Sequence, residues 1–319
     1  MTEQPTASFA AGNGCIPERL DRDTLEQIRE LAKLCERHEG LKLKLHASML
    51  ESRSPGARRD FLWKNTEGRL IGYLGLNSFE PDSAEVVGLV HPDRRCEGIF
   101  SELFRTAERE ARSQGITRLI LICPENSQSG KGYIKSLGIE RSFSEYVMRW
   151  SEEDDRSAAR QEGGEREDEQ ERIPSVSLRL CGAADKELVV MLDMLGFDMP
   201  RDAAEPFADR VLANGPEDRV FAAFLENGEP AGKICIQSKE GAVYLFGFSV
   251  LPEHRGKGFG RTILREAIRL ARSEGCESLG LEVECENRGA LGLYHSCGFR
   301  ETAVQDYYHF DVQESEIRS

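Results

Sequence analysis

The stretch His254-Arg-Gly-Lys-Gly-Phe-Gly-Arg261 places three glycines at alternate positions directly before a helical pattern. Glycine tolerates positive φ and has no β-carbon, so such a turn lets a ligand approach the backbone closely. The first N–H groups of the following helix lack intrahelical partners and carry partial positive charge, which suits phosphate. The stretch therefore predicts a phosphate-binding turn. The alternative is a tight strand-to-helix turn with solvated basic side chains.

A similar stretch occurs 160 positions earlier in the chain, as Gly258 is numbered 160 above Gly98. The matching pairs are Val90 and Val250, Pro92 and Pro252, Arg95 and Arg255, Gly98 and Gly258, Gly115 and Gly275, and Gly138 and Gly298. A constant offset without insertions indicates an internal repeat. We therefore expect two copies of one domain in the 319 residues.

The segment between the copies is strongly acidic. Residues 151–172 hold ten acidic residues and four arginines, whereas the whole chain has a net charge of −14. Such a segment buries too little apolar surface to offset its ordering entropy, which predicts a solvated linker. One exposed charged helix is the alternative. The expected domains are residues 1–150, with a disordered tail over 1–16, and residues 173–319.

Composition excludes several classes of protein. The net negative charge argues against a nucleic-acid binder with a broad basic face. No apolar run is long enough to span a bilayer, and the first residues show no secretory signal pattern. The nine cysteines form no Cys-x-x-Cys pair and stand mostly in apolar runs. Reduced core thiols and no metal site are expected, which indicates a cytoplasmic protein.

The apolar pattern predicts an α+β fold with a mixed, mostly antiparallel sheet in each copy. In the second copy the patterns predict a hairpin over 219–238, strands over 242–250, 278–284 and 306–312, and helices over 260–274 and 287–297. The first copy repeats this order, with helices near 22–38 and 99–114 and strands near 60–77, 84–90 and 118–123.

Two other glycine motifs do not fit. A P-loop needs Gly-x-x-x-x-Gly-Lys-Ser/Thr, and a dinucleotide fingerprint needs Gly-x-Gly-x-x-Gly. Here Arg255-x-x-Gly258-x-Gly260 is followed by Asn287-x-x-Ala290-x-x-Leu293-Tyr294-x-x-x-Gly298-Phe299. This order and spacing resembles the GNAT acetyltransferase family. The duplicated chain resembles a tandem member, an arrangement similar to that of mycothiol synthases.

The resemblance implies acetyl-CoA as cosubstrate, no metal, and an N-acetyltransferase reaction on a primary amine. It places the cosubstrate on the strand end, the glycine turn and the next helix start: Phe248, Val250, Arg255, Gly256, Lys257, Gly258, Phe259, Gly260, Arg261 and Asn287. The backbone N–H of Val250 is expected beside the thioester carbonyl. The alternative for Asn287 is a helix N-cap.

The reaction needs a deprotonated amine and a proton for the departing thiolate, whose thiol has a pKa of about 8.5. The resemblance assigns the proton donor to Tyr294, against the alternative of an aromatic ring packed on the sheet. Glu282 in Leu281-Glu282-Val283 is the candidate base, because ribosomal-protein alanine N-acetyltransferases carry a similar Leu-Glu-Val. A solvated pair of Glu282 and Glu284 is an equally weighted alternative.

At the positions 160 lower, the first copy lacks the residues to which these roles are assigned. Ile134 stands where Tyr294 does, Ile122 where Glu282 does, and Phe100 where Gly260 does. An alignment with one inserted residue would instead bring Asn126 and Tyr133 into register. We expect catalysis in the second copy. The sequence does not name the acceptor, which is a small-molecule amine or a peptide N-terminus; the competing hypothesis is a non-catalytic acyl-CoA-binding regulator or scaffold.

Overall fold

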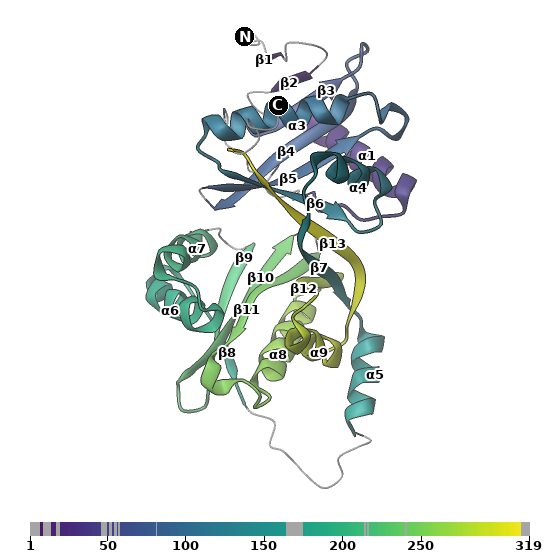
Figure 1. Ribbon diagram of the computed structural model, residues 1–319. Coiled ribbons are helices and arrows are strands. Elements are labelled where there is room, and N and C mark those ends of the chain that lie inside the picture. Colours follow the sequence, from purple (N-terminus) through teal and green to yellow (C-terminus); the bar gives the residue numbers. More distant parts are fainter. Residues whose placement is uncertain are drawn as a thin grey trace. The chain divides into compact units, whose positions relative to one another are not determined.

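The structure is a computed structural model that describes residues 20–45, 58–80, 82–163, 175–213, 217–239 and 241–313, with positions 7–8, 14–16, 50, 53, 56 and 215 between them. Two compact units make up the chain, and each contains a sheet flanked by helices (Figure 1). Unit 1 comprises Met1–Glu145 and Ala303–Ser319, and unit 2 comprises Tyr146–Thr302.

The sheet of unit 1 has the strand order β1-β2-β3-β4-β5-β6-β13. Its strands are β1 (Ala7–Ser8), β2 (Gly14–Ile16), β3 (Asp60–Lys64), β4 (Leu70–Glu80), β5 (Ser83–Val90), β6 (Arg118–Pro124) and the main part of β13 (Phe299–Asp311). Neighbours are antiparallel except β5 and β6, which pair in parallel. This mixture follows from the helix that connects those two strands.

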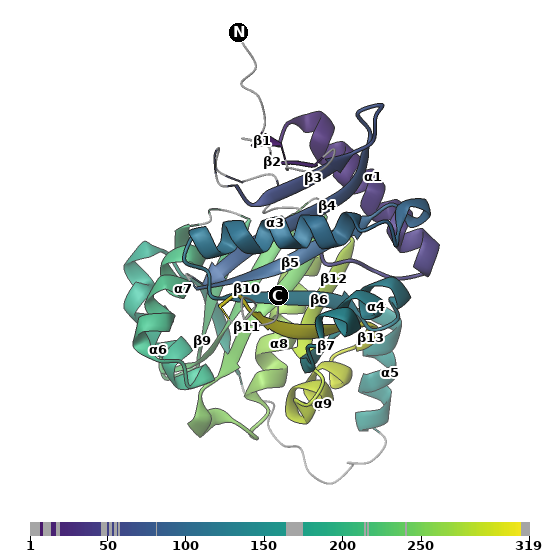
Figure 2. The same cartoon turned by 45° about the horizontal axis from the view of Figure 1, so that its top comes forward.

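Helices cover both faces of this sheet. They are α1 (Arg22–Glu39), α3 (Ile99–Ser113), α4 (Gln128–Leu137) and the 3₁₀ turn η1 (Pro92–Arg94). The apolar stripe of α1, with Ile28 and Leu31, packs on Tyr73 from one face. Leu103 and Phe104 of α3 pack with the opposite face, and α3 crosses β4 and β5 in Figure 2.

The sheet of unit 2 has the strand order β7-β12-β11-β10-β9-β8. Its strands are the end of β7 (Arg141–Trp150), β12 (Ser278–Glu284), β11 (Ala242–Val250), β10 (Pro230–Lys239), β9 (Asp218–Phe224) and β8 (Ser177–Leu180). The helices are α5 (Glu152–Gly163), α6 (Lys186–Phe197), α7 (Arg201–Ala213), α8 (Phe259–Ser273) and α9 (Arg288–Ser296), with 3₁₀ turns η2 (Ala183–Asp185) and η3 (Pro252–His254).

Two apolar clusters fill unit 2. Ile263, Leu264 and Leu281 belong to a cluster that joins α8 and α9 to one face of the sheet. Val189, Ala208 and other side chains of α6 and α7 form the second cluster, on the other face. Figure 1 shows these two helices on the opposite side of the sheet from α8 and α9. Within the described ranges no helix is long and apolar enough to cross a membrane. The nine cysteines lie within the described positions as thiols, with no disulfide between them.

The predicted α+β fold and the repeat are confirmed. Strand β4 begins at Leu70 and β10 at Pro230, and α3 and α8 begin at Ile99 and Phe259, so the offset of 160 persists in the structure. Ser127 caps α4 by accepting the Gly130 N–H, as Asn287 caps α9 by accepting the Ala290 N–H. The ungapped register is therefore the structural one.

The unit boundaries differ from the expected domains at the last strands. Gln305–Asp311 of β13 pairs antiparallel with β6 of the first copy. In turn Met148 of β7 is fully buried in the core of unit 2. Residues 303–319 thus belong to unit 1 and residues 146–150 to unit 2. Unit 1 therefore ends in the last strand of the second copy.

The expected linker and tail also differ from the structure. Residues 152–163 form α5, whose Ala158 is buried and whose Glu152 and Asp154 form ion pairs with Arg272 and Arg300. The charged helix is therefore found there, while 164–172 lies outside the described residues. In the expected tail, 7–8 and 14–16 are strands β1 and β2, and the other positions lie outside the described residues.

Candidate active site

The predicted site of unit 2 lies where two parallel strands part. β11 and β12 pair from Ala242 with Ser278 to Leu245 with Leu281, yet the strands continue to Val250 and Glu284. The facing edges beyond that point leave backbone groups without this strand partner, so they are open to a ligand. Unit 1 repeats the opening, because β5 and β6 pair only as far as Val86 with Leu121.

A β-bulge distinguishes the opening in unit 2. Cys235 pairs with Phe246 but Lys233 pairs with Ser249, so Gly247 and Phe248 both lie opposite Ile234. Gly247 has a φ of 51°. The extra residue turns Phe248 toward α8 and α9, whereas Phe246 packs with α6 and α7. Bulges of this kind re-aim residues beside active sites.

The glycine turn connects this strand end to α8. Gly256 and Gly258 have φ angles of 72° and 83°, and a β-carbon on either would meet no atom within 4 Å. The turn is exposed and leads into a helix of 15 residues. Lys257 and Arg261 add positive charge at the helix start. This geometry fits a diphosphate.

Arg255 has a structural role in this turn. Its Nε donates to the Val250 carbonyl at 2.9 Å, and its Nη2 donates to the Gly196 carbonyl of α6 at 2.6 Å. The arginine therefore fixes the turn to the strand end and to α6. In unit 1 Arg95 Nε donates to the Val90 carbonyl at 3.3 Å, so the first of these bonds is repeated.

The first turn of α8 meets α9 and the strand end at Gly260. A β-carbon there would lie 3.2 Å from Leu293 Cδ2, 3.4 Å from Val250 Cγ2 and 3.9 Å from Phe248 Cζ. Tyr294 follows Leu293 and is buried, with its ring 6.4 Å from that of Phe248. Burial raises the pKa of Tyr294 to about 12. The phenol is therefore protonated at neutral pH, as a proton donor requires.

Glu282 is half-buried on β12. Its neighbours Leu281 and Val283 pack in the α8 core, so Glu282 lies on the sheet face that α6 and α7 cover. Glu284 shares this face but is exposed. Asn287 is exposed, and its Oδ1 accepts the Ala290 N–H at 3.1 Å, so the N-cap is present.

Unit 1 has a cavity of about 450 Å³ at the equivalent opening. Its lining is mostly apolar and includes Gly88, Val90, Phe100, Ile122, Tyr133 and Ile134. The basic turn is altered, because Glu97 replaces Lys257 and pairs with Arg94 at 2.8 Å. Phe100 stands where unit 2 has Gly260, so the first turn of α3 carries a ring where that of α8 carries no side chain.

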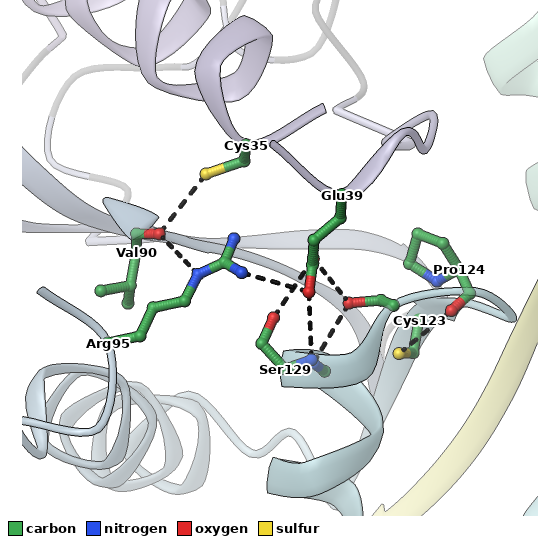
Figure 3. A network of polar contacts seen from close by, with 9 residues as sticks. Cys35, Glu39, Val90, Arg95, Cys123, Pro124 and Ser129 are labelled. Atoms are coloured by element: carbon green, nitrogen blue, oxygen red, sulfur yellow. Dashed lines mark hydrogen bonds and ion pairs between the residues drawn. The ribbon is translucent and has the colours of Figure 1, made fainter. Parts of the chain in front are cut away.

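A carboxylate network forms part of the lining of this cavity. Glu39, at the end of α1, pairs with Arg95 at 3.1 Å and accepts bonds from Ser127 Oγ and from the N–H and Oγ of Ser129 (Figure 3). Burial opposes its charge, but the Ser129 N–H and the Arg95 guanidinium outweigh burial and lower the pKa of Glu39. No local pattern in the sequence predicts this network, because Glu39, Arg95 and Ser129 are far apart in the chain.

The matches to known proteins reflect the repeat. The Acetyltransferase (GNAT) family profile matches residues 25–139 and again 189–299. A mycothiol acetyltransferase of Amycolatopsis mediterranei is 27% identical over 318 residues, covering 92% of this chain and 99% of that protein. The [Ribosomal protein bS18]-alanine N-acetyltransferase of Escherichia coli (strain K12) is 30% identical over 110 residues, which are 34% of this chain and 74% of the relative.

Solved structures show the same fold over nearly the whole chain. A GCN5-related N-acetyltransferase from Sphaerobacter thermophilus has a TM-score of 0.73 at 18% identity, covering 92% of this chain and 95% of the other. A tandem GNAT protein from the clavulanic acid biosynthesis pathway has a TM-score of 0.63 at 18% identity, covering 92% and 96%. On its two family matches, the chain is a tandem member of the GNAT acetyltransferase family.

Proposed function

We propose that this protein transfers the acetyl group of acetyl-CoA to a primary amine and that unit 2 performs the chemistry. The observation that carries the proposal is that the bulged strand end and the glycine turn meet at Gly260, with buried Tyr294 beside Phe248 of that strand end. Acetyl-CoA supplies the reactive thioester. The open space around Gly256 and Gly258, together with the cations of the turn, fits its diphosphate arm.

Each step has a candidate group in this chain. Glu282 takes a proton from the ammonium form of the acceptor and releases it to solvent, and the neutral nitrogen then bonds to the acetyl carbon. As the amide forms, Glu282 takes the second proton from that nitrogen. The Val250 N–H donates to the carbonyl oxygen as negative charge develops on it. When the carbon–sulfur bond breaks, Tyr294 donates its phenol proton to the sulfur. Bulk solvent then returns a proton to the tyrosine and removes one from Glu282.

Unit 1 lacks the groups for this sequence of steps. Ile122 and Ile134 offer no proton, and Ile134 is buried in the core. Phe100, Glu97 and the Glu39 network further alter the equivalent turn. The competing function, a non-catalytic acyl-CoA-binding regulator, does not account for the retention of Tyr294 and Glu282 in unit 2.

The acceptor remains a choice between two classes that relatives suggest. The likeness to mycothiol acetyltransferases extends over about nine-tenths of the chain, which favours a small-molecule amine. The likeness to the bS18-alanine enzyme covers one copy and favours a peptide that begins with alanine. We propose the small-molecule amine, because the tandem arrangement as a whole is what the first group of relatives shares.

The test is thiol release from acetyl-CoA by the full-length chain, with a panel of small amines and alanine-initiated peptides. A specific acceptor should release thiol at a saturable rate. Lys257→Glu, which introduces the Glu97-type charge at an exposed position, should raise the KM for acetyl-CoA about tenfold or more. Tight acetyl-CoA binding without thiol release by any amine would favour the regulator instead.

A further inference from the structure

Unit 2 encloses an ion pair that the proposed chemistry does not use. Nζ of Lys233 on β10 lies 2.7 Å from Oδ1 of Asp193 on α6, and the two side chains are 0% and 1% exposed. The ammonium also faces the rings of Phe207 at 4.7 Å and Phe197 at 5.7 Å. Both charges are therefore fully removed from water.

Such a pair is weak evidence of a contribution to stability. The desolvation of two charges often exceeds their attraction, and apolar replacements of similar volume frequently stabilise a core. Among the described residues, neither Asp193 oxygen accepts a well-aligned hydrogen bond that would add to the ion pair. A role in fixing local geometry accounts better for its presence.

The pair lies directly against the bulge. A β-carbon on Gly247 would be 3.2 Å from Cys235 Sγ and 3.5 Å from Lys233 Nζ. Lys233 is itself the residue after which the β10–β11 register shifts. The ammonium thus packs beneath the extra residue that turns Phe248 toward α8.

The same helix also holds the glycine turn. The carbonyl of Gly196, three positions after Asp193 on α6, accepts a hydrogen bond from the Arg255 guanidinium at 2.6 Å. Arg255 in turn binds the Val250 carbonyl. Helix α6 is therefore linked to the segment 247–255 at two places. Asp193 holds Lys233, which packs under the bulge, and Gly196 holds Arg255 at the turn.

The first copy provides an internal comparison. Tyr73 stands at the position of Lys233, and Lys33 at that of Asp193. Buried Tyr73 donates to Asp60 at 2.8 Å instead. There β4 and β5 pair without a bulge from Gly72 with Val90 to Asn77 with Glu85. The ion pair and the bulge occur together, in the copy that keeps Tyr294.

We infer that Lys233 and Asp193 are positioning residues, which hold the bulge at Gly247 and thereby aim the backbone up to Val250 at the thioester carbonyl. This inference rests on the proposed function of unit 2. It predicts that the pair acts on the acetyl group and on turnover rather than on the binding of the CoA arm, whose turn is fixed separately by Arg255.

The test uses the full-length double variant Lys233→Met/Asp193→Leu, which replaces both charges by apolar side chains. Affinities for acetyl-CoA and for CoA are measured calorimetrically, together with kcat and thermal unfolding. We expect CoA affinity within about twofold of the original, loss of the preference for acetyl-CoA over CoA, and a kcat lower by about tenfold or more. Tyr73→Phe, at the equivalent position of unit 1, should leave the CoA affinity, the preference for acetyl-CoA and kcat unchanged.

A second variant keeps the inference testable if the double variant does not fold. Gly247→Ala leaves the ion pair in place but disfavours the bulge, because the residue has a φ of 51°. It should reproduce the loss of acetyl preference and of kcat. Full kcat and full acetyl preference in either folded variant would overturn the inference. Full turnover in Tyr294→Phe would instead contradict the proposed function, which separates the two failures.

Discussion

A β-carbon on Gly88 of β5 would lie only 2.1 Å from Cε2 of Phe100 on α3. In the second copy the ring comes from the strand, as Phe248, and the helix position is Gly260. The space between this strand and the next helix is thus occupied by a ring from the helix in the first copy and by a ring from the strand in the second. The first turn of α8 carries no side chain at this position, and Leu293, Val250 and Phe248 lie within 4 Å of where a β-carbon would stand.

We predict that the double variant Phe248→Gly/Gly260→Phe, which introduces the first-copy arrangement, folds but binds acetyl-CoA at least tenfold more weakly. Each single change should destabilise the protein, by about 3–5 kcal/mol where the ring is lost and by about 1–3 kcal/mol where it is added against Leu293 and Val250. The double change should cost less than the two single values together. If, in denaturant unfolding, the losses of unfolding free energy in the two single variants add up to the loss in the double variant, the two rings do not occupy the same space.

Tyr294→Phe should lower kcat by about 10²–10⁴-fold with little change in acetyl-CoA affinity. Tyr133→Phe, in the helix of the first copy, is the matched control and should keep full turnover. Steady-state kinetics and calorimetry measure both. A Tyr294→Phe enzyme with the original kcat would exclude this tyrosine as the proton donor.

The raised pKa of Tyr294, about 12, also predicts a pH effect on stability. The folded pKa is above the unfolded value of about 10, so the stabilisation is complete below pH 10 and is lost as pH rises through 12. The free energy of unfolding should therefore fall more steeply between pH 10 and 12 in the original chain than in Tyr294→Phe. Equal slopes would mean that the phenol is not protected by burial.

Much of this site could be read from the sequence, because its motifs are local. The turn, the N-cap at Asn287 and the position of Tyr294 lie within short segments whose spacing fixes their geometry. The bulge had no such local signal. The even-numbered positions Ala242, Tyr244, Phe246, Phe248 and Val250 are apolar throughout the strand, so the two-residue period does not shift at Gly247.

The exchange of last strands could not be read in this way. The ends of β7 and β13 are both short apolar–polar alternations, and either could pair with β6 or β12. Their partners are decided by long-range packing, such as that of Met148 in unit 2. Helix α5 was expected only as the alternative to a solvated linker, since its contacts through Glu152 and Asp154 are to residues more than 100 positions away.

Glu282→Gln should reduce kcat most strongly at low pH, where removal of the amine proton is hardest. Glu284→Gln is the matched control, because Glu284 lies on the same strand and face but is exposed. We expect the control to keep nearly the full rate across pH 6–9, the range over which amines of pKa about 8 titrate. Equal losses in the two variants would indicate a general charge effect rather than a positioned base.

Gly298→Ala should destabilise the protein more than Gly138→Ala. Both glycines follow a helix at positive φ, 85° and 65°. A left-handed conformation costs a residue with a β-carbon about 1–2 kcal/mol. At Gly298 the added carbon would also lie 2.7 Å from the Asp155 backbone, whereas at Gly138 it would meet no atom within 4 Å. Equal losses of unfolding free energy in the two variants, measured by denaturant unfolding, would show that α5 can move away from the added carbon without cost.

The final prediction concerns which fragment contains a complete second unit. A fragment of residues 146–302 includes the end of β7, next to β12 in the strand order, and all of α5. A fragment of residues 173–319 lacks both and retains residues 303–311, whose partner β6 is absent. We expect the first fragment to fold cooperatively and bind acetyl-CoA within about threefold of the full chain.

The second fragment should aggregate or bind acetyl-CoA at least tenfold more weakly, because β12 becomes an unpaired edge and the core loses Met148. Circular dichroism and calorimetry on both fragments provide the measurement. If the 173–319 fragment instead folds and binds like the full chain, β13 must be able to take the place of β7 beside β12. The exchanged strands would then be interchangeable, and the boundary at residue 146 would reflect how the two copies are joined rather than what unit 2 needs in order to fold.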